Sequence, residues 1–548
     1  MSDRRTASPR RTAARAIALG SSGVLLALAL PATAATAAPG NACDNRTNNS
    51  YDKLLTCVTL DGVVEHMEAF QRIADESTDP VYPGSRAAGT EGYADSVDYV
   101  AGLLRNAGYT VTLDPVPVTF FRPSTLSQVT PTAAEHPIAI ATGSGYGTFS
   151  GPVIPVDVNL SGDRVNSSGC EAGDFAGLDF GGPTDIALVQ RGTCSFEIKA
   201  RNAEAAGAEA VVIFNQGDTI GGGDRLGVVS PTLGAFQAEG PVVGTSFAAG
   251  EALARAGSTA LIDVQEPEQR TDYNVIAELP GENVDNVVMA GAHLDSVTEG
   301  PGINDNGSGS AALLETALLM AKSKTPNTLR FGWWAAEEEG LVGSRDYVAG
   351  LSQAERDRIA LYMNYDMVGS PNYYLGVYDA DESTFPAPVV VPEGSEAIED
   401  VYEAYYTKVG QPYDDSEFSG RSDYQAFIQS GIPSGGLFTG AEVRKTPEQQ
   451  AVWGGTAGNQ FDPCYHAACD DIANYDAGAL EVNSDLIAYA MLHFGYSTEA
   501  VNGVPGKKVP GPAFTLPAPA GPEGTFAGGG GGLAHDHVHD HDHERESA

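Results

Sequence analysis

The stretch Val287-Val-Met-Ala-Gly-Ala-His-Leu-Asp295 is an apolar run that ends in a histidine and an aspartate. An apolar run of this length is typical of a strand that is buried on both faces, as in a parallel sheet. Similar runs follow at residues 328–335 and 359–365. Residues 311–322, which lie between the first and the second run, show a helical pattern. This alternation of strands and helices predicts an α/β domain with a largely parallel sheet.

Acids and histidines follow these apolar runs or lie in short loops near them. In open α/β sheets such positions gather at the carboxyl edge of the sheet. Carboxylates packed together repel one another unless a cation compensates their charge. The pattern therefore predicts a metal site, and the side chains that it brings together are His293, Asp305, Glu337, Glu338, Glu339, Asp366 and His466.

The N-terminus has the three regions of a secretory signal in the correct order. Five arginines lie within residues 1–15, an apolar run covers residues 16–30, and small residues continue to Ala38. This pattern predicts a signal peptide over residues 1–37, with cleavage after Ala34 or Ala37, and a secreted, extracellular protein. General secretion is favoured over twin-arginine export, because the residues after Arg10-Arg11 match that signal poorly. No other stretch approaches the ~18 apolar residues of a membrane span.

The charge balance narrows the class of partner. The 548 residues contain 31 Lys and Arg against 72 Asp and Glu, which gives a net charge of -41 at pH 7. A surface of this charge repels phosphate backbones and anionic lipids. We therefore expect neither nucleic acid nor a membrane as a partner, and a chain that acts as a monomer.

The six cysteines lie in close pairs along the sequence. In an oxidising compartment this spacing predicts three disulfides, each of which stabilises the fold by ~2 to 4 kcal/mol. A cysteine zinc site is disfavoured, because no C-x-x-C pair is present. The predicted pairs are Cys43 with Cys57, Cys170 with Cys194, and Cys464 with Cys469.

Residues 122–271 differ from the sequence on either side, with short strands, Gly and Pro in place of the α/β alternation. The segment Arg191-Gly-Thr-Cys-Ser-Phe-Glu-Ile-Lys199 within it closely resembles the protease-associated domain. The resemblance implies a mostly-β insertion, a Cys170–Cys194 pair, and a lid or substrate-restricting module without chemistry of its own. The peptidase domain would then consist of residues 43–121 and 272–500.

The C-terminal residues 501–548 are rich in Pro and Gly and end in alternating His and Asp from His535 to His543. Such a composition cannot build a core, so we predict a disordered tail. Interleaved His and Asp bind divalent metals weakly, which leaves a zinc-gathering role and a solvated tail without function as equal alternatives.

Five segments of the α/β domain together resemble the secreted two-zinc aminopeptidases, the group of bacterial leucine aminopeptidases and aminopeptidase Y. The resemblance covers residues 59–497 with the insertion removed, and it implies a three-layer α/β/α domain around a mixed, largely parallel sheet. It makes His293 and Asp366 ligands of a first zinc, Glu338 and His466 ligands of a second, and Asp305 the carboxylate that bridges both. It also implies a cis peptide bond between Asp305 and Asn306.

The same resemblance assigns the remaining roles. The sequence itself does not say which of Glu337 and Glu338 binds metal, but the alignment on Gly340-Leu-Val-Gly-Ser344 makes Glu337 the general base. Tyr465 matches the tyrosine that donates to the developing oxyanion. Asp295 is expected to accept a hydrogen bond from the ring nitrogen of His293 that does not bind metal, and so to fix the tautomer of the imidazole. The residues that match positions near the substrate are Met367, Arg421 and Phe438.

The implied function is zinc-dependent removal of the N-terminal residue from peptides with a free N-terminus. Met and Phe near the substrate favour an apolar first residue. Calcium stays open: the candidate acids are Glu481 and Asp485, but Cys57 stands about where the expected N-terminal aspartate should be.

Three alternative functions are weighed against this one. A dipeptidase or carboxypeptidase of the same fold would need basic residues that converge on the site, and only Arg421 stands out. A non-catalytic, receptor-like ectodomain would have lost metal ligands, whereas all five are present. The third alternative is a zinc-scavenging protein, which the His/Asp tail suggests.

Overall fold

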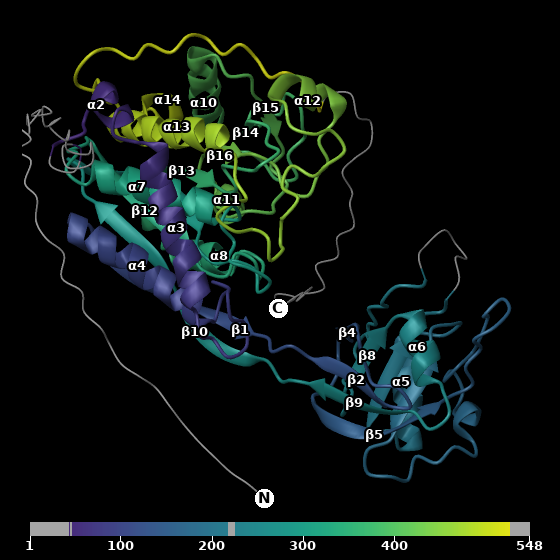
Figure 1. Ribbon diagram of the computed structural model, residues 1–548. Helices are drawn as coiled ribbons and strands as arrows, with labels where there is room; N and C mark the ends of the chain where they lie inside the picture. Colours follow the sequence, from purple (N-terminus) through teal and green to yellow (C-terminus); the bar gives the residue numbers. More distant parts are fainter. Residues whose placement is uncertain (1–42, 44–45, 218–224, 527–548) are drawn as a thin grey trace, which may run out of the picture.

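Figure 1 shows a computed structural model of the chain, with two lobes that are joined by a pair of long strands. The structure describes residue 43 and residues 46–217 and 225–526. The predicted signal peptide over residues 1–37 and the His535–His543 tract lie outside the described residues. Among the helices within the described ranges, none is long and apolar enough to cross a membrane.

The larger lobe is built on an eight-stranded sheet in the order β1-β10-β12-β11-β13-β16-β14-β15. Its centre, from β12 through β11 and β13 to β16, is parallel. The antiparallel pairs are β1 with β10, β10 with β12, and β14 with β16. The predicted mixed, largely parallel sheet is therefore confirmed. The strands are β1 (Thr110–Phe120), β10 (Glu268–Leu279), β11 (Asn283–His293), β12 (Asn327–Trp334), β13 (Ile359–Tyr365), β14 (Gly376–Tyr378), β15 (Asp414–Ser416) and β16 (Ser434–Phe438).

The apolar runs form strands because both faces of the sheet are covered by helices. Trp333 and Trp334 are neighbours on β12, yet they lie in different hydrophobic clusters, one on each face of the sheet. The helices of this lobe thus complete the predicted three-layer arrangement (Figure 1). They are α2 (Tyr51–Leu55), α3 (Leu60–Glu76), α4 (Glu91–Ala107), α7 (Gly307–Met320), α10 (Glu396–Val409), α12 (Pro447–Trp453), α13 (Ala477–Tyr496) and α14 (Glu499–Asn502), with α8 (Val342–Gly350), α9 (Gln353–Arg358) and α11 (Tyr424–Gln429).

Helix α7 begins directly beneath the sheet edge, and its first turn approaches β13 closely. The Asn306 side chain caps this helix by accepting a hydrogen bond from the Gly309 N–H at 3.0 Å, and it donates to the carbonyl oxygen of Tyr365 at 2.9 Å. Gly309 is needed here, because a Cβ at this position would lie 2.2 Å from that same carbonyl oxygen. The helix start and the strand end are thereby locked together.

The smaller lobe is the insertion, and it has its own eight-stranded sheet, in the order β3-β2-β9-β5-β6-β7-β8-β4. Strands β1 and β10 pair along their whole length, from Thr110 opposite Glu278 to Phe120 opposite Glu268, and lead into and out of this lobe. Its elements are β2 (Thr125–Thr130), β3 (Ala134–His136), β4 (Ile138–Ile140), β5 (Gly147–Pro155), η1 (Ala172–Phe175), β6 (Ile186–Gln190), α5 (Phe196–Ala206), β7 (Ala210–Phe214), β8 (Val242–Thr245), α6 (Phe247–Leu253) and β9 (Thr259–Val264).

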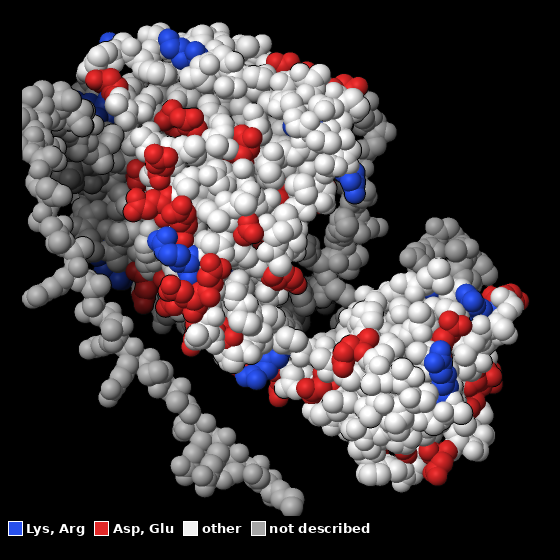
Figure 2. All heavy atoms as spheres, in the orientation of Figure 1, with Lys and Arg blue, Asp and Glu red and all other residues white. Residues whose placement is uncertain are grey.

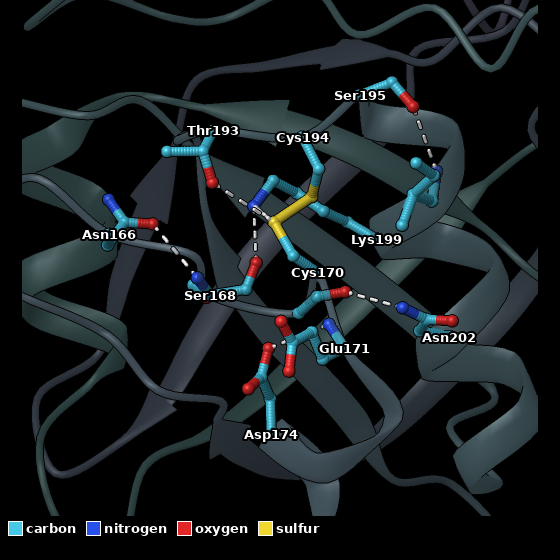
Figure 3. Close-up of a disulfide and its surroundings, with 12 residues drawn as sticks. Asn166, Ser168, Cys170, Glu171, Asp174, Thr193, Cys194, Ser195, Lys199 and Asn202 are labelled. Atoms are coloured by element: carbon cyan, nitrogen blue, oxygen red, sulfur yellow. Dashed lines mark hydrogen bonds between the residues drawn. A yellow bond between two sulfur atoms is a disulfide. The ribbon is translucent and has the colours of Figure 1, made fainter.

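All three predicted disulfides are formed. Figure 3 shows the Cys170–Cys194 bond beside the buried ammonium group of Lys199, which donates to the carbonyl oxygen of Ser168. Burial lowers the pKa of Lys199 to about 8. Lys199 thus ties α5 to the disulfide loop, which gives this residue of the insertion a structural role.

The prediction of a disordered tail is wrong for residues 501–526. Phe514 packs on Tyr51 and Tyr489 of the peptidase lobe, with ring centroids 5.5 and 5.0 Å apart. Further along, the N–H of Glu523 donates to the carbonyl oxygen of Tyr413 at 2.9 Å. A segment rich in Pro and Gly builds no core of its own. Here its few apolar side chains pack on the peptidase lobe, which also accepts hydrogen bonds from its backbone N–H groups.

The acidic composition is visible on the surface. In the face that Figure 2 shows, acidic side chains outnumber basic ones and gather over α3 and α4. Both helices are amphipathic: their polar sides, which bear these acids, face the solvent, and their apolar sides pack into the core.

We predict that Gly309→Ala lowers the unfolding midpoint, because the added methyl group meets the Tyr365 carbonyl oxygen and overpacking costs ~1 to 3 kcal/mol. The matched control is Gly102→Ala in α4, where nothing lies within 4 Å of the added atom. This control should stabilise the protein by roughly 0.5 to 1 kcal/mol. Calorimetry of both variants is the measurement, and a Gly309→Ala midpoint at or above that of the wild type contradicts the close approach.

Candidate metal centre

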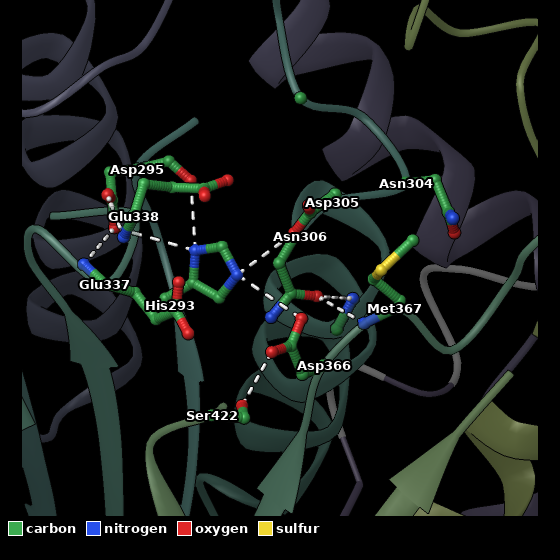
Figure 4. Close-up of polar contacts among 12 residues, drawn as sticks. His293, Asp295, Asn304, Asp305, Asn306, Glu337, Glu338, Asp366, Met367 and Ser422 are labelled. Carbon is green, nitrogen blue, oxygen red and sulfur yellow. Dashed lines mark hydrogen bonds and ion pairs between the residues drawn. The ribbon is translucent and has the colours of Figure 1, made fainter. Parts of the chain in front are cut away.

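The side chains that the sequence singled out meet at the carboxyl edge of the large sheet. His293 is the last residue of β11, Glu337 and Glu338 lie just beyond the end of β12, and Asp366 directly follows β13. Asp305 immediately precedes the first turn of α7. Figure 4 shows that one nitrogen of the His293 ring faces both Asp305 and Asp366, while the other faces Asp295.

Two groups of potential metal ligands share Asp305. In the first, Nε2 of His293 lies 3.2 Å from Oδ1 of Asp305 and 3.3 Å from Oδ1 of Asp366. In the second, Nε2 of His466 lies 3.4 Å from Oδ2 of Asp305 and 3.0 Å from Oε2 of Glu338. Asp305 thus presents one oxygen to each group, as a bridging carboxylate does. All ligand atoms within a group lie within 4.8 Å of one another.

The buried carboxylates of the cluster repel one another, and a cation among them would reduce this repulsion. Burial raises the pKa of Glu338 to about 7, and the neighbouring Asp305 carboxylate adds to the rise. Burial lowers the pKa of His466, but its contacts with Asp305 and Glu338 raise it to about 10. In addition, Oε1 of Glu338 is buried without a hydrogen-bond partner in the described part of the chain.

The two ligand groups that share Asp305 and the electrostatics of the cluster both fit a pair of divalent cations. His nitrogen and carboxylate oxygen are ordinary zinc ligands, and a two-metal site needs an anionic ligand between the ions. The residues present therefore fit two zinc ions, one held by His293, Asp305 and Asp366 and the other by Asp305, Glu338 and His466.

Asp295 supports the centre in a different way from the one expected. Nδ1 of His293 lies 3.1 Å from the backbone carbonyl oxygen of Asp295 and 3.5 Å from its carboxylate. The carboxylate instead accepts the N–H groups of Glu337 and Glu338, at 3.1 and 3.2 Å. Asp295 thus fixes the backbone from which both glutamates project, and its carbonyl oxygen is the nearer partner of the imidazole.

The loop that carries Asp305 is held by residues that the sequence did not single out. The carboxylate of Asp470 accepts the N–H groups of Asn304 and Asp305, at 2.8 and 3.0 Å. The Asp305–Asn306 peptide bond is cis, as the resemblance implied. The position of Asp470, directly after the Cys464–Cys469 pair, is the one sequence signal that could have identified it.

Arg86 is a second supporting residue that was missed. Its guanidinium group is fully buried and donates to the carbonyl oxygens of Leu294, Pro301 and Gly302. These carbonyls belong to the segments that follow His293 and precede Asp305. Arg86 therefore ties together two stretches of backbone that bear candidate metal ligands, and no local sequence pattern marks it for this role.

The remaining predicted site residues line one cavity with the candidate metal ligands. This cavity of about 110 Å³ is bordered by Glu337, Tyr465, Met367, Arg421 and Phe438, together with Asp305, Glu338, Asp366 and His466. Nη2 of Arg421 lies 3.2 Å from the hydroxyl of Tyr465, while its Nη1 pairs with Glu442 at 2.7 Å. Arg421 thus borders the cavity itself and also contacts the hydroxyl group of Tyr465.

The calcium candidates do not come together with a third ligand. Among the described residues, Glu481 and Asp485 belong to no group of three metal-binding side chains. Outside the centre, the acidic groups are Asp379 with Asp381 and Glu399, and Glu399 with Glu403 and Asp415, and neither contains a histidine. The structure therefore adds no support to calcium at Glu481 and Asp485.

Comparison with known proteins agrees with this geometry. The family model "Peptidase family M28" matches residues 274–491, and the PA domain model matches residues 149–253. An aminopeptidase of Pseudomonas aeruginosa strain UCBPP-PA14 is 45% identical over 457 residues, which are 81% of this chain and 83% of that protein. The chain belongs to peptidase family M28. It is an M28 aminopeptidase with an inserted PA domain, so the predicted family and fold are confirmed.

Other M28 relatives support the same assignment. The "probable lipoprotein aminopeptidase LpqL" of Mycobacterium tuberculosis is 39% identical, over 82% of this chain and 87% of that protein. Among solved structures, the aminopeptidase from Aneurinibacillus sp. strain AM-1 is 27% identical with a TM-score of 0.52, and it matches over 85% of this chain and 98% of its own. BSAP, a zinc aminopeptidase from Bacillus subtilis, is 25% identical with a TM-score of 0.53 over 80% of this chain and 95% of its own.

We predict that Asp470→Ala weakens zinc binding by about 10- to 100-fold, the usual effect of losing a group that positions a metal ligand. The reason is that the N–H groups of Asn304 and Asp305 lose their acceptor. Asp471→Ala is the control, since Asp471 accepts only a local hydrogen bond from Ala473. Zinc titration with a competing chelator measures both variants, and equal zinc affinity in the two would show that Asp470 does not position the bridging loop.

Proposed function

We propose that this M28 aminopeptidase is a secreted enzyme that uses two zinc ions to hydrolyse the first peptide bond of peptides with an apolar first residue. The observation that carries the proposal is the pair of ligand groups that share Asp305. Zinc bound by these groups would polarise the peptide carbonyl group and lower the pKa of water, which makes hydrolysis feasible at neutral pH.

Glu337 is the general base in this proposal. It lines the cavity but belongs to neither ligand group, and only 9% of its surface is exposed. A carboxylate in this position takes a proton from the attacking water and returns it to the leaving amine. Its backbone is fixed by the hydrogen bond to Asp295, so the side chain starts from a defined point.

Tyr465 is the proposed donor to the developing oxyanion. Tyr465 lines the cavity, and its hydroxyl group accepts a hydrogen bond from Arg421. The guanidinium group has no acceptor, so at the tyrosine oxygen it donates and leaves the phenolic proton free to point into the cavity. A positioned donor of this kind stabilises negative charge as it forms on the carbonyl oxygen.

The cavity favours a free amine over a free carboxylate. Glu337 and Asp366 border it and would attract the positive N-terminus of a peptide. Arg421 is the one Lys or Arg among its lining residues, and this side chain is already paired with Glu442. A carboxypeptidase or dipeptidase that recognises a C-terminal carboxylate is therefore the weaker reading of the same site.

The apolar part of the cavity supports the proposed preference for the first residue. Met367, Tyr378 and Phe438 line it beside the carboxylates that would hold the amine. Secretion is supported by the three-region pattern of residues 1–37 and by the three disulfides, which persist in oxidising compartments.

We predict that the enzyme cleaves leucine p-nitroanilide and that a chelator abolishes this activity, with recovery on addition of zinc. N-acetyl-leucine p-nitroanilide should be inert, because the acetylated nitrogen carries no charge for Glu337 and Asp366 to bind. Nitroaniline release followed by absorbance is the measurement. Turnover that resists the chelator would contradict the proposed metal dependence, and equal cleavage of the two compounds would contradict the requirement for a free N-terminus.

We further predict that Glu337→Gln lowers kcat by at least about 100-fold, which is the contribution expected of a general base. Bound zinc should stay at the wild-type level, because Glu337 is in neither ligand group. Glu338→Gln is the matched control at the adjacent position and should lose zinc. Metal analysis by mass spectrometry separates the two, and the reverse pattern would exchange the roles of these residues.

A further inference from the structure

A second cavity of about 310 Å³ opens beside the one at the metal centre. The two cavities share five lining residues, which are Glu417, Ser419, Arg421, Phe438 and Ala441. The second cavity contains none of the proposed metal ligands. Half of its eight additional lining residues are aromatic, and two others, Asp415 and Glu442, are acidic. The aromatic residues are Tyr374, Phe385, Phe461 and Phe526.

Phe526 reaches this cavity from the C-terminal segment, far outside the α/β core in sequence. The residues before it are anchored on the fully buried carboxylate of Asp414, which accepts the N–H groups of Gly524 and Thr525 at 3.1 and 2.8 Å. The Thr525 hydroxyl also donates to Asp414, at 2.5 Å. Asp414 is the first residue of β15, and the strand is followed directly by Glu417, which borders both cavities.

The ring of Phe526 is fixed by two aromatic partners. Its centroid lies 5.3 Å from that of Tyr374 and 5.8 Å from that of Phe385. Tyr374 in turn contacts Phe438, the ring that borders both cavities, with centroids 6.3 Å apart. An unbroken aromatic surface therefore runs from the wall beside the metal centre to the C-terminal segment.

We propose that the second cavity extends the pocket for the side chain of the first substrate residue, and that Phe526 is a specificity-determining wall of this extension. The inference rests on the proposed aminopeptidase function. The cavity at the metal centre is small, about 110 Å³. The wall that it shares with the larger space contains Phe438 and Ala441 beside the polar residues Glu417, Ser419 and Arg421. Long aliphatic and aromatic first residues reach Phe526, whereas alanine ends before it.

The same segment provides a control residue. Phe514 also packs on the peptidase lobe, against Tyr405 and Tyr489 with centroids 5.9 and 5.0 Å apart, but it lines neither cavity. A loss of packing at Phe514 therefore tests what loosening of the segment does without a change in the pocket wall.

The experiment compares kcat/KM for phenylalanine, leucine and alanine p-nitroanilides, which share one leaving group. For Phe526→Ala we expect a fall of roughly tenfold with phenylalanine and leucine, the effect of a lost apolar contact in a specificity pocket. With alanine the value should stay within about twofold. Phe514→Ala should lower the unfolding midpoint and leave the ratios of the three substrates unchanged, and Phe526→Leu should recover most of the loss with leucine.

Two results would overturn the inference. One is an unchanged phenylalanine-to-alanine ratio in Phe526→Ala, whether kcat/KM stays the same or falls equally with all three substrates. The other is an effect that follows the second residue in a series of leucyl dipeptides, which would assign the cavity to the other side of the scissile bond. In each case wild-type turnover and zinc content still report on the proposed function, which fails separately if the wild-type enzyme cleaves none of the compounds.

Discussion

The repulsion among buried carboxylates at one edge of a parallel sheet is the constraint on which this structure depends. Asp305 lies within reach of both imidazoles, with Asp366 beside His293 and Glu338 beside His466, and all three carboxylates are largely buried. Charges this close in a buried site are stable only when a cation compensates them or when protons do. A fold that brings these carboxylates together before the metal binds must fix the backbone of the segments that carry them.

That support comes mainly from backbone contacts. Asp295 and Asp470 each accept two N–H groups from the segments that carry the cavity-lining acids, and Arg86 donates to three carbonyl oxygens in the loops between them. Backbone groups cannot adopt other rotamers, so these contacts fix the loops more firmly than side-chain pairs would. The positions of the ligands are thus set by the paths of the loops, and the remaining freedom is a few side-chain torsions.

The sequence predicted the sheet and the general place of the site well, because both follow from local patterns. The apolar run that ends at His293 had to be a buried strand, and acids at the ends of several such runs had to meet. The individual roles were another matter: nothing in residues 337–339 tells which glutamate faces the ligands, and only the resemblance to a known family separated Glu337 from Glu338. Arg86 escaped notice because its partners are carbonyl groups more than 200 residues away, which no local pattern reveals.

The error at the C-terminus has the same origin. Composition correctly showed that residues 501–526 cannot form a core, but it could not show that a buried carboxylate, Asp414, and a row of aromatic rings were available to receive them. Phe526 lies outside the stretch of residues 274–491 that matches the M28 family model, whereas all five proposed metal ligands lie inside it. Under the proposal for Phe526, two enzymes with the same family segment can share the proposed hydrolytic centre and still differ in the wall that limits the first side chain. Substrate preference could then change at the C-terminal end of the chain without a change in the residues at the sheet edge.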